Sequence, residues 1–288
     1  MKEPSKKVMT REEYRKIKKK KKLVLKTWVL KVLIVLFSLA LILSLLKIYF
    51  WTQDNKKIAD ITKEINEIVT PTPIEEEGEL INPPEDKAND YWDYVKLPFY
   101  EVDFTALKEK NPDTIAFIHM QGNNINYPVV QTDNNDYYLK HAYDKSKNSA
   151  GWVFMDYRNN ITDLSENTVI YGHGRLDETV FGSLKNALTK TWQANKENYV
   201  IWLTTEKENL VFQIFSIYTI PSENYYIETD FSSSADKEKW LNTMKERNTT
   251  SFDTSVNTND KILTLSTCQN NNGGRIVVQA KLIKRQSR

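Results

Sequence analysis

Cysteine, glycine, proline and histidine are all scarce in this 288-residue chain, which has one Cys, 8 Gly, 9 Pro and 3 His. A single thiol cannot form an internal disulfide, so a disulfide-stapled fold is excluded. The low glycine and proline content excludes a collagen-like chain, and a hydrophobic share of 40% excludes a wholly disordered one. The length suits one large domain or two small ones with a substantial core.

An overall excess of one charge is also missing, since 40 Lys and Arg stand against 38 Asp and Glu. The two signs are nevertheless unevenly distributed along the chain. Residues 1–50 hold 14 basic and 3 acidic residues, whereas the rest of the chain holds 26 basic and 35 acidic ones. A nucleic-acid-binding domain would not confine its positive charge to one flank, so the pattern excludes nucleic acid as a partner.

The one long hydrophobic run, residues 28–50, follows a basic tail at residues 1–27. As a helix it would measure about 34 Å, enough to cross a bilayer, with Lys31 and Lys47 reaching the two interfaces. The basic tail predicts a cytoplasmic N-terminus and an exported remainder, and therefore a single-pass protein of the cell membrane. A cleaved signal peptide is the alternative. The run is not followed by a small-x-small pair, which favours an uncleaved anchor in contact with membrane lipid.

Residues 51–90 are rich in proline and glutamate, which predicts an extracellular stalk with a short helix near 59–69. The remaining residues, 91–288, contain eight short runs of strand-forming residues: 114–120, 125–131, 151–157, 168–173, 199–205, 210–220, 261–267 and 275–283. Eight strands without regular helical alternation predict a mostly β fold, a closed or nearly closed mixed barrel. Apolar spacing predicts added helices at 181–192 and, before the seventh strand, at 236–248.

The single cysteine, Cys268, ends the strand KILTLST and opens the loop QNNNGG. An antiparallel hairpin would set Cys268 and Arg275 side by side, with Cα atoms about 5 Å apart. A guanidinium there would favour a thiolate or a developing oxyanion. A lone cysteine is commonly a buried core residue, but this one lies at a strand end in a domain predicted to be exported. The residues alone leave packing and catalysis as about equal alternatives.

A cysteine nucleophile needs an acid–base partner, which is usually histidine. His119 lies within an apolar strand, where a structural role is favoured, and His141 lies in YYLKHAYD, at a surface helix or turn. His173 ends the strand TVIYGH between two glycines, so it is the candidate. These histidines and Cys268 are too widely separated to predict a metal site, and no glycine-rich phosphate loop is present, so no cofactor is expected.

The order His173, TLSTC ending at Cys268, and Arg275 resembles the sortases, membrane-anchored cysteine transpeptidases of Gram-positive bacteria. The resemblance covers about residues 90–285, including INYPVVQ, GWVFMDYRN, NTVIYGHGR with VFGSL, KILTLSTC and RIVVQAKL. TLSTC, FMDYRN and the helical insert before the seventh strand resemble class B specifically. The resemblance implies an eight-stranded sortase-type β-barrel preceded by N-terminal helices, with residues 91–288 as the catalytic domain.

By the same resemblance, Cys268 would be the nucleophile, His173 the acid–base residue and Arg275 the cation that stabilises the oxyanion or positions the substrate. Six further residues are expected to line the class B substrate groove: Asn126, Val130, Tyr171, Ser266, Thr267 and Gln269. Two positions depart from the family pattern. Gln269 replaces an acidic residue of some relatives and Gly174 a bulkier polar one, which affects substrate preference more than chemistry.

The resemblance implies cleavage of a C-terminal sorting motif, of NPxTx type, in exported proteins through a thioacyl intermediate, and transfer to the amine of a lipid-linked peptidoglycan precursor. A pilin-polymerising sortase is the nearest alternative, but LIKRQSR at the C-terminus offers no second membrane span, which favours wall anchoring. A papain-like hydrolase ranks lower because such enzymes place Cys before His. A non-catalytic surface domain that binds peptide or glycan is the last alternative.

Overall fold

The computed structural model describes residues 9–68, 72–74, 76–221, 223–268 and 274–288. The chain divides into two compact units, Met1–Gln53 and Asp54–Arg288. Helix α1 (Arg11–Ile68) begins in the first unit and continues into the second. Within Lys26–Glu67, α1 contains one stretch that is long and apolar enough to cross a membrane, and its apolar side chains are exposed. The predicted anchor, residues 28–50, lies within Lys26–Glu67, and this part of α1 is a candidate membrane span.

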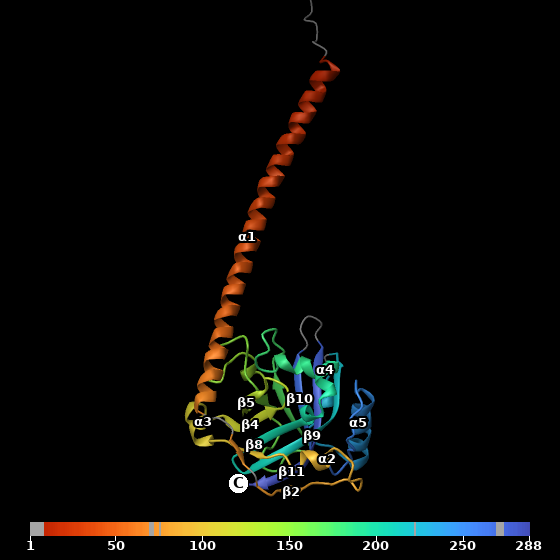
Figure 1. Ribbon diagram of the computed structural model, residues 1–288. Helices are drawn as coiled ribbons and strands as arrows, with labels where there is room; N and C mark the ends of the chain where they lie inside the picture. Colours follow the sequence, from red (N-terminus) through yellow and green to blue (C-terminus); the bar gives the residue numbers. More distant parts are fainter. Residues whose placement is uncertain (1–8, 69–71, 75, 222, 269–273) are drawn as a thin grey trace, which may run out of the picture. The chain divides into compact units, whose positions relative to one another are not determined.

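The second unit is built on a closed barrel of eight strands (Figure 1). These are β4 (Thr114–Met120), β5 (Asn126–Val130), β6 (Phe154–Met155), β7 (Asn167–Gly172), β8 (Val200–Thr205), β9 (Glu208–Ile220), β10 (Ile262–Cys268) and β11 (Arg275–Ser287). Their order is β10-β7-β6-β5-β4-β8-β9-β11, and pairing of β10 with β11 closes the barrel. The predicted fold is therefore confirmed: each of the eight predicted runs contributes one strand, although the run at 151–157 contributes only β6.

Shorter elements surround the barrel. β2 (Glu79–Leu80) pairs with β11, and β1 (Thr72–Ile74) pairs with β3 (Phe99–Glu101). The helices after α1 are α2 (Tyr91–Tyr94), α3 (Phe104–Lys110), η1 (Tyr137–Leu139), η2 (Gly182–Leu188), α4 (Lys190–Ala194), η3 (Lys196–Tyr199), η4 (Tyr225–Ile227) and α5 (Ser234–Glu246). The sequence patterns did not predict β1, β2, β3, α2 or α3: the three strands have only two or three residues, and the two helices have at most about two turns, too few to show a clear helical periodicity.

The predicted helix at 181–192 is divided into η2 and α4. Gly182 packs so closely on the Arg175 carbonyl that a Cβ would lie 2.3 Å from that oxygen, which fixes the start of η2 in a tight turn. Thr189 then adopts an extended conformation, and its hydroxyl caps α4 by accepting a hydrogen bond from the Trp192 N–H. A capping threonine interrupts a helix because its side chain competes for backbone hydrogen bonds.

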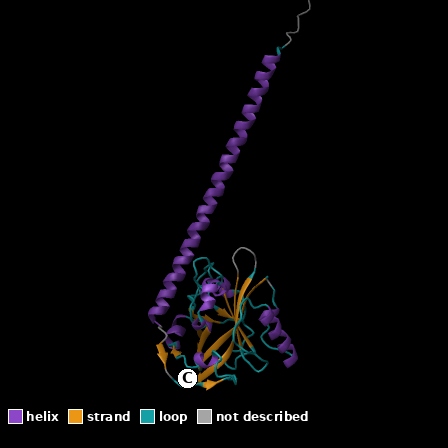
Figure 2. Cartoon of the chain, turned by 45° about the vertical axis from the view of Figure 1, so that its right-hand side comes forward, coloured by secondary structure: helices purple, strands orange, loops and turns teal. Residues whose placement is uncertain are grey.

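The predicted helix before the seventh strand is α5, which lies outside the barrel (Figures 1 and 2). Its buried apolar residues are those that the sequence indicated, Trp240, Leu241 and Met244. They form a cluster with residues of β9 and β11, including Phe215 and Val277, separate from the main core inside the barrel. Burial of this apolar stripe attaches α5 to the outer face of the sheet.

Part of the segment predicted as a stalk packs into the second unit. Ile58, Ile61 and Ile65 of α1 are at most 9% exposed and belong to the main core. Their spacing of three and four residues places them on one face of the helix. The compact unit therefore includes α1 from Asp54 onward.

A buried carboxylate, Asp156, follows β6 and is hydrogen-bonded to three other side chains. Its oxygens accept hydrogen bonds from the Arg158 guanidinium, at 2.9 Å, from the Tyr171 hydroxyl, at 2.8 Å, and from the Asn135 side chain, at 3.0 Å. Arg158 also donates to the Ile227 carbonyl at 2.9 Å. Burial opposes ionisation of Asp156, but the hydrogen bonds and charge of Arg158, with the Tyr171 hydroxyl, outweigh it and lower the pKa.

Replacing Leu241 should measure how strongly α5 is held. Leu241→Ala removes buried methyl groups from the α5 cluster and should lower the free energy of unfolding by about 2–5 kcal/mol. Lys239→Ala, on the exposed side of the same helix, is the control and should change it by no more than about 0.5 kcal/mol. Urea unfolding of the full chain in detergent tests both. Equal effects of the two substitutions would contradict the packing described.

The lowered pKa of Asp156 has a consequence for stability at acid pH. The ionised carboxylate stabilises the fold above the unfolded-state pKa of about 3.9, and this contribution is lost as the pH falls through the lower folded-state value. Asp156→Asn should therefore cost about 3 kcal/mol at neutral pH, and the difference from the unaltered chain should shrink below about pH 4. Urea unfolding of both proteins at several pH values measures this difference. A difference that does not vary with pH would be inconsistent with the pairing.

Candidate active site

Three strand ends meet at one edge of the barrel: those of the hairpin β10–β11 and that of β7, which is about 95 positions earlier in the chain. β10 runs parallel to β7 with Thr267 opposite Gly172, and antiparallel to β11 with Cys268 opposite Arg275. His173 follows Gly172 directly, so the backbones of His173 and Cys268 stand at the same level of neighbouring strands. The register therefore brings together the three residues that the sequence singled out, of which Cys268 is described in its backbone only.

A pocket of about 410 Å³ opens at this edge. Its lining residues are Asn135, Asp136, Leu139, Phe154, Tyr171, Gly172, His173, Glu223, Asn224, Tyr226, Ile227, Ser266, Thr267 and Arg275. They come from four regions of the chain: the segment at η1, strands β6 and β7, the segment at η4, and the ends of β10 and β11. The mixture of apolar and polar side chains is typical of a site that binds a small ligand or a short peptide.

Five of the six predicted groove residues can be placed, and they fall into two groups. Tyr171, Ser266 and Thr267 line the pocket. Asn126 and Val130 are not among the described lining residues: the Asn126 side chain donates to Asn66 at 3.4 Å, and Val130 is fully buried in the core. Gln269 lies outside the described residues.

Two irregular segments contribute residues to the pocket lining that the sequence analysis did not predict. Asn135, Asp136 and Leu139 lie at η1, and Glu223, Asn224, Tyr226 and Ile227 lie at η4. Both segments combine aromatic residues with Asn, Asp or Glu, in NNDYYL and ENYYI, and this pairing is the signal available in the sequence. The pattern is weak because such loops occur widely on protein surfaces.

The imidazole of His173 has a defined orientation. Its Nε2 lies 2.9 Å from the Leu139 carbonyl oxygen, and since a carbonyl only accepts, Nε2 carries the hydrogen. The Cδ2 side of the ring lies against Gly151, where a Cβ would come within 2.9 Å of Cδ2. Gly151 has a φ of +61°, which glycine adopts at little cost. In the neutral ring, Nδ1 therefore holds the lone pair that can accept a proton.

Hydrogen bonds fix the polar walls of the pocket. The Tyr226 hydroxyl and Ser266 Oγ are 2.8 Å apart, and both residues are almost fully buried. Tyr171 donates to Asp156, and burial, followed by the charge of Asp156, raises the pKa of this tyrosine. Tyr171 is therefore a neutral donor at physiological pH. The half-buried Arg275 supplies a permanent positive charge to the pocket lining.

The other two histidines lie elsewhere. His119 packs against Tyr100 and Trp202, with ring centroids 5.3 and 5.4 Å away, and burial lowers its pKa. His141 stacks on Tyr137 at 4.0 Å. Among the described residues, no three His, Cys, Asp or Glu side chains are grouped as ligands for a metal ion.

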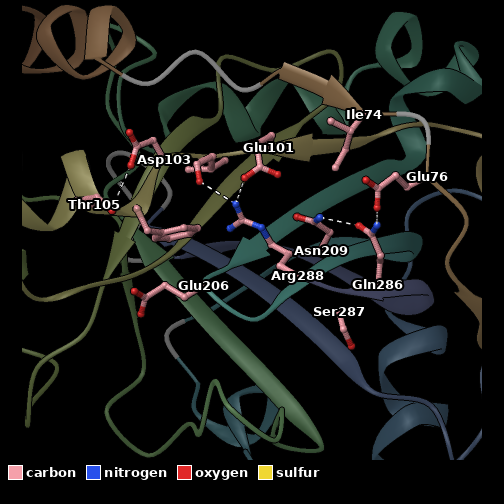
Figure 3. A pocket seen from close by; sticks show the side chains of 12 residues that line it. Ile74, Glu76, Glu101, Asp103, Thr105, Glu206, Asn209, Gln286, Ser287 and Arg288 are labelled. Carbon is pink, nitrogen blue, oxygen red and sulfur yellow. Dashed lines mark hydrogen bonds and ion pairs between the residues drawn. The ribbon is translucent and has the colours of Figure 1, made fainter.

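A second pocket, of about 660 Å³, lies near the end of β11 (Figure 3). Its polar side chains are largely paired with one another. Arg288 pairs with Glu101, and Gln286 contacts both Asn209, at 2.8 Å, and Glu76. None of the nine residues proposed above for chemistry or substrate binding is among its lining residues. We therefore place the candidate site at the smaller pocket.

Comparison with known proteins shows the family to which the chain belongs. The profile of the sortase domain family matches residues 118–283. The chain is 36% identical over 182 residues to sortase B of Listeria monocytogenes, which covers 62% of this chain and 72% of that protein. It is 33% identical over 184 residues to sortase B of Staphylococcus aureus, which covers 63% and 75% respectively.

Solved structures give the same result. A protein of Bacillus anthracis described as similar to sortase B matches with a TM-score of 0.64 and 34% identity, over 82% of this chain and 98% of that one. A complex of Staphylococcus aureus sortase B with its substrate matches with a TM-score of 0.59 and 33% identity, over 63% and 84%. With more than half of its length matched by the family profile, this chain belongs to the sortase family of cysteine transpeptidases and resembles its class B members.

Proposed function

We propose that this enzyme is a membrane-anchored sortase that cleaves an NPxTx-like sorting motif near the C-terminus of exported proteins and joins them to a peptidoglycan amine. Cys268 is the nucleophile, His173 the acid–base residue and Arg275 the cation at the oxyanion. The observation that carries the proposal is the strand register: Cys268 pairs with Arg275, and Thr267 before it pairs with Gly172, which precedes His173. His173 and Arg275 also line the pocket.

The first half of the reaction forms a thioester. The Cys268 thiolate attacks the carbonyl carbon of the residue that becomes the new C-terminus of the substrate. Arg275 and backbone N–H groups near Cys268 stabilise the negative charge that develops on the carbonyl oxygen. As the peptide C–N bond breaks, protonated His173 gives its Nδ1 proton to the departing amine.

The second half reverses these steps with a different amine. The incoming amine attacks the thioester carbon, and neutral His173 takes the proton that the amine loses. The C–S bond then breaks, a new amide bond remains, and the Cys268 thiolate is restored. One matched structure, at 33% identity and a TM-score of 0.59, is a sortase B complexed with triglycine, a peptide with a free amine. This complex supports an amine acceptor for the enzyme proposed here.

The lining of the pocket suits a short extended peptide. Leu139, Phe154 and Ile227 offer apolar contacts, which fit a proline or an aliphatic side chain. Asn135 and Asn224 offer amide donors and acceptors for a polar side chain or a peptide backbone. The substrate-bound relative from Staphylococcus aureus supports recognition of a sorting peptide by this pocket.

The candidate membrane span in α1 supports anchoring. The basic residues before it favour a cytoplasmic N-terminus, so the catalytic unit would lie outside the cell. An exported substrate and a lipid-linked acceptor would both lie near the same membrane surface. Confinement to one surface raises the effective concentration of all three partners.

The thioacyl intermediate provides the first test of this function. The full chain in detergent, incubated with a library of NPxTx peptides and no amine, should gain the mass of the acyl fragment because the thioester then turns over only by hydrolysis. Cys268→Ala should gain none, since it lacks the sulfur, and Cys268→Ser serves as a near-isosteric control for folding. Intact-protein mass spectrometry at acid pH detects the adduct. An adduct on Cys268→Ala, or none from any motif on the unaltered chain, would refute the assignment.

Replacing Arg275 with lysine separates the contribution of its planar guanidinium from that of its positive charge. Arg275→Lys keeps a positive charge but loses the fixed planar donors, so kcat/KM should fall about 100-fold or more. Arg285→Lys, ten residues along the same strand, pairs with Glu208 away from the pocket and should leave kcat/KM unchanged. A fluorogenic sorting peptide measures both. Full activity of Arg275→Lys would exclude the proposed part of Arg275.

A further inference from the structure

The orientation of the His173 ring depends on a loop that is distant in the chain. The ring rests on Gly151, the last residue of the loop 148–151, and its Nε2 is bonded to Leu139. The N–H of Gly151 donates a hydrogen bond to the Asn148 carbonyl at 3.2 Å, so the two ends of this loop are bonded to each other. A shift of this loop would therefore move the surface on which the imidazole lies.

Asp54 of α1 fixes this loop. Its carboxylate accepts hydrogen bonds from the Ser149 hydroxyl and from the Ser149 N–H, the latter at 3.1 Å. Its backbone carbonyl accepts one from the Asn148 side chain at 3.2 Å, and Asn148 is only 3% exposed. Asn148 Oδ1 also accepts from the Ala150 N–H at 2.8 Å. A continuous series of contacts thus runs from Asp54 to the glycine behind the ring.

The next residue of α1, Asn55, contacts the segment that follows His173 in the chain. Its Oδ1 accepts a hydrogen bond from the guanidinium of Arg175, two residues after His173. Arg175 is 9% exposed, and its Nε also donates to Thr179 Oγ1 at 3.0 Å. The loop then returns to His173, whose carbonyl accepts from the Phe181 N–H at 3.2 Å. Asn55 therefore supports the loop that follows the ring.

α1 can serve as a fixed support for both loops because one of its faces is buried. Asp54 lies four residues before Ile58, and Ile61 and Ile65 continue the same face at spacings of three and four. The three isoleucines belong to the main core of the second unit. This apolar contact fixes the rotation of the helix about its axis, and hence the direction in which Asp54 and Asn55 point.

We propose that Asp54 and Asn55 are positioning residues for His173 in acyl transfer, a role that rests on the function proposed above. Neither is among the described residues that line the pocket, so each acts through a loop beside the ring. With either contact removed, the imidazole would tilt away from the strand end at Cys268. Both proton transfers would slow, whereas the groove that binds the peptide would be unchanged.

The kinetic test compares Asp54→Ala and Asn55→Ala with the unaltered full chain in detergent. In each variant kcat should fall about tenfold while KM stays within about twofold, because the geometry of proton transfer is disturbed and the groove is not. Asp54→Asn keeps a side-chain oxygen that can accept from Ser149 and should recover most of the lost kcat. Gln53→Ala and Asp60→Ala, at exposed positions of the same helix, are matched controls and should leave kcat unchanged.

Two further measurements are made on the enzyme alone, without a substrate peptide. The ¹⁵N chemical shifts of the His173 imidazole report its tautomer, and both alanine variants should lose the preference for the proton on Nε2. The chain has one cysteine, so the rate of its alkylation by iodoacetamide reports on Cys268 alone. The pH profile of this rate should change in both variants because the ring would no longer face the thiol in one orientation.

Kinetic constants, imidazole shifts and alkylation profiles equal to those of the controls would overturn the proposal. A fall in kcat that only follows a loss of folded protein, measured by the urea midpoint, would overturn it as well. If the unaltered chain transfers no peptide, the proposed function fails, and the imidazole and alkylation measurements still decide whether Asp54 and Asn55 orient the ring.

Discussion

The pairing of β10 on both sides is the constraint on which the candidate site depends. Backbone N–H and C=O groups of a buried strand must be paired, so β10 is fixed at once against β7 and β11. A slip of one residue against either neighbour would turn every side chain of β10 to the other face. The same hydrogen bonds that close the barrel therefore determine which residues stand beside Cys268.

Much of the fold could be predicted from the sequence, because its signals are local. The eight strands are short runs of β-branched and aromatic residues between turns, and α5 shows its buried stripe as Trp240, Leu241 and Met244. The hairpin from Cys268 to Arg275 is also local, since only six residues separate them. His173 could be chosen from the sequence because only three histidines were available and the other two had simpler explanations.

The rest could not be predicted because it depends on contacts between distant segments. Nothing near Leu139 in the sequence indicates that its carbonyl meets a ring 34 residues later. Asn126 and Val130 were expected in the groove from resemblance alone, whereas the barrel turns Val130 into the core. The helix predicted at 181–192 is divided at Thr189, where local capping overrides apolar periodicity.

The pocket is held by two sets of polar contacts that share none of their residues. Asp156 and Arg158 fix Tyr171, Asn135 and Ile227, which form the wall that a substrate would meet. The contacts of α1 instead support the loops around His173, on the side where protons would be exchanged. Because distant sites without common partners contribute independently, peptide binding and proton transfer can respond separately to substitution. In this architecture, the register of the barrel places the reacting residues, and loops held from outside the barrel orient the ring.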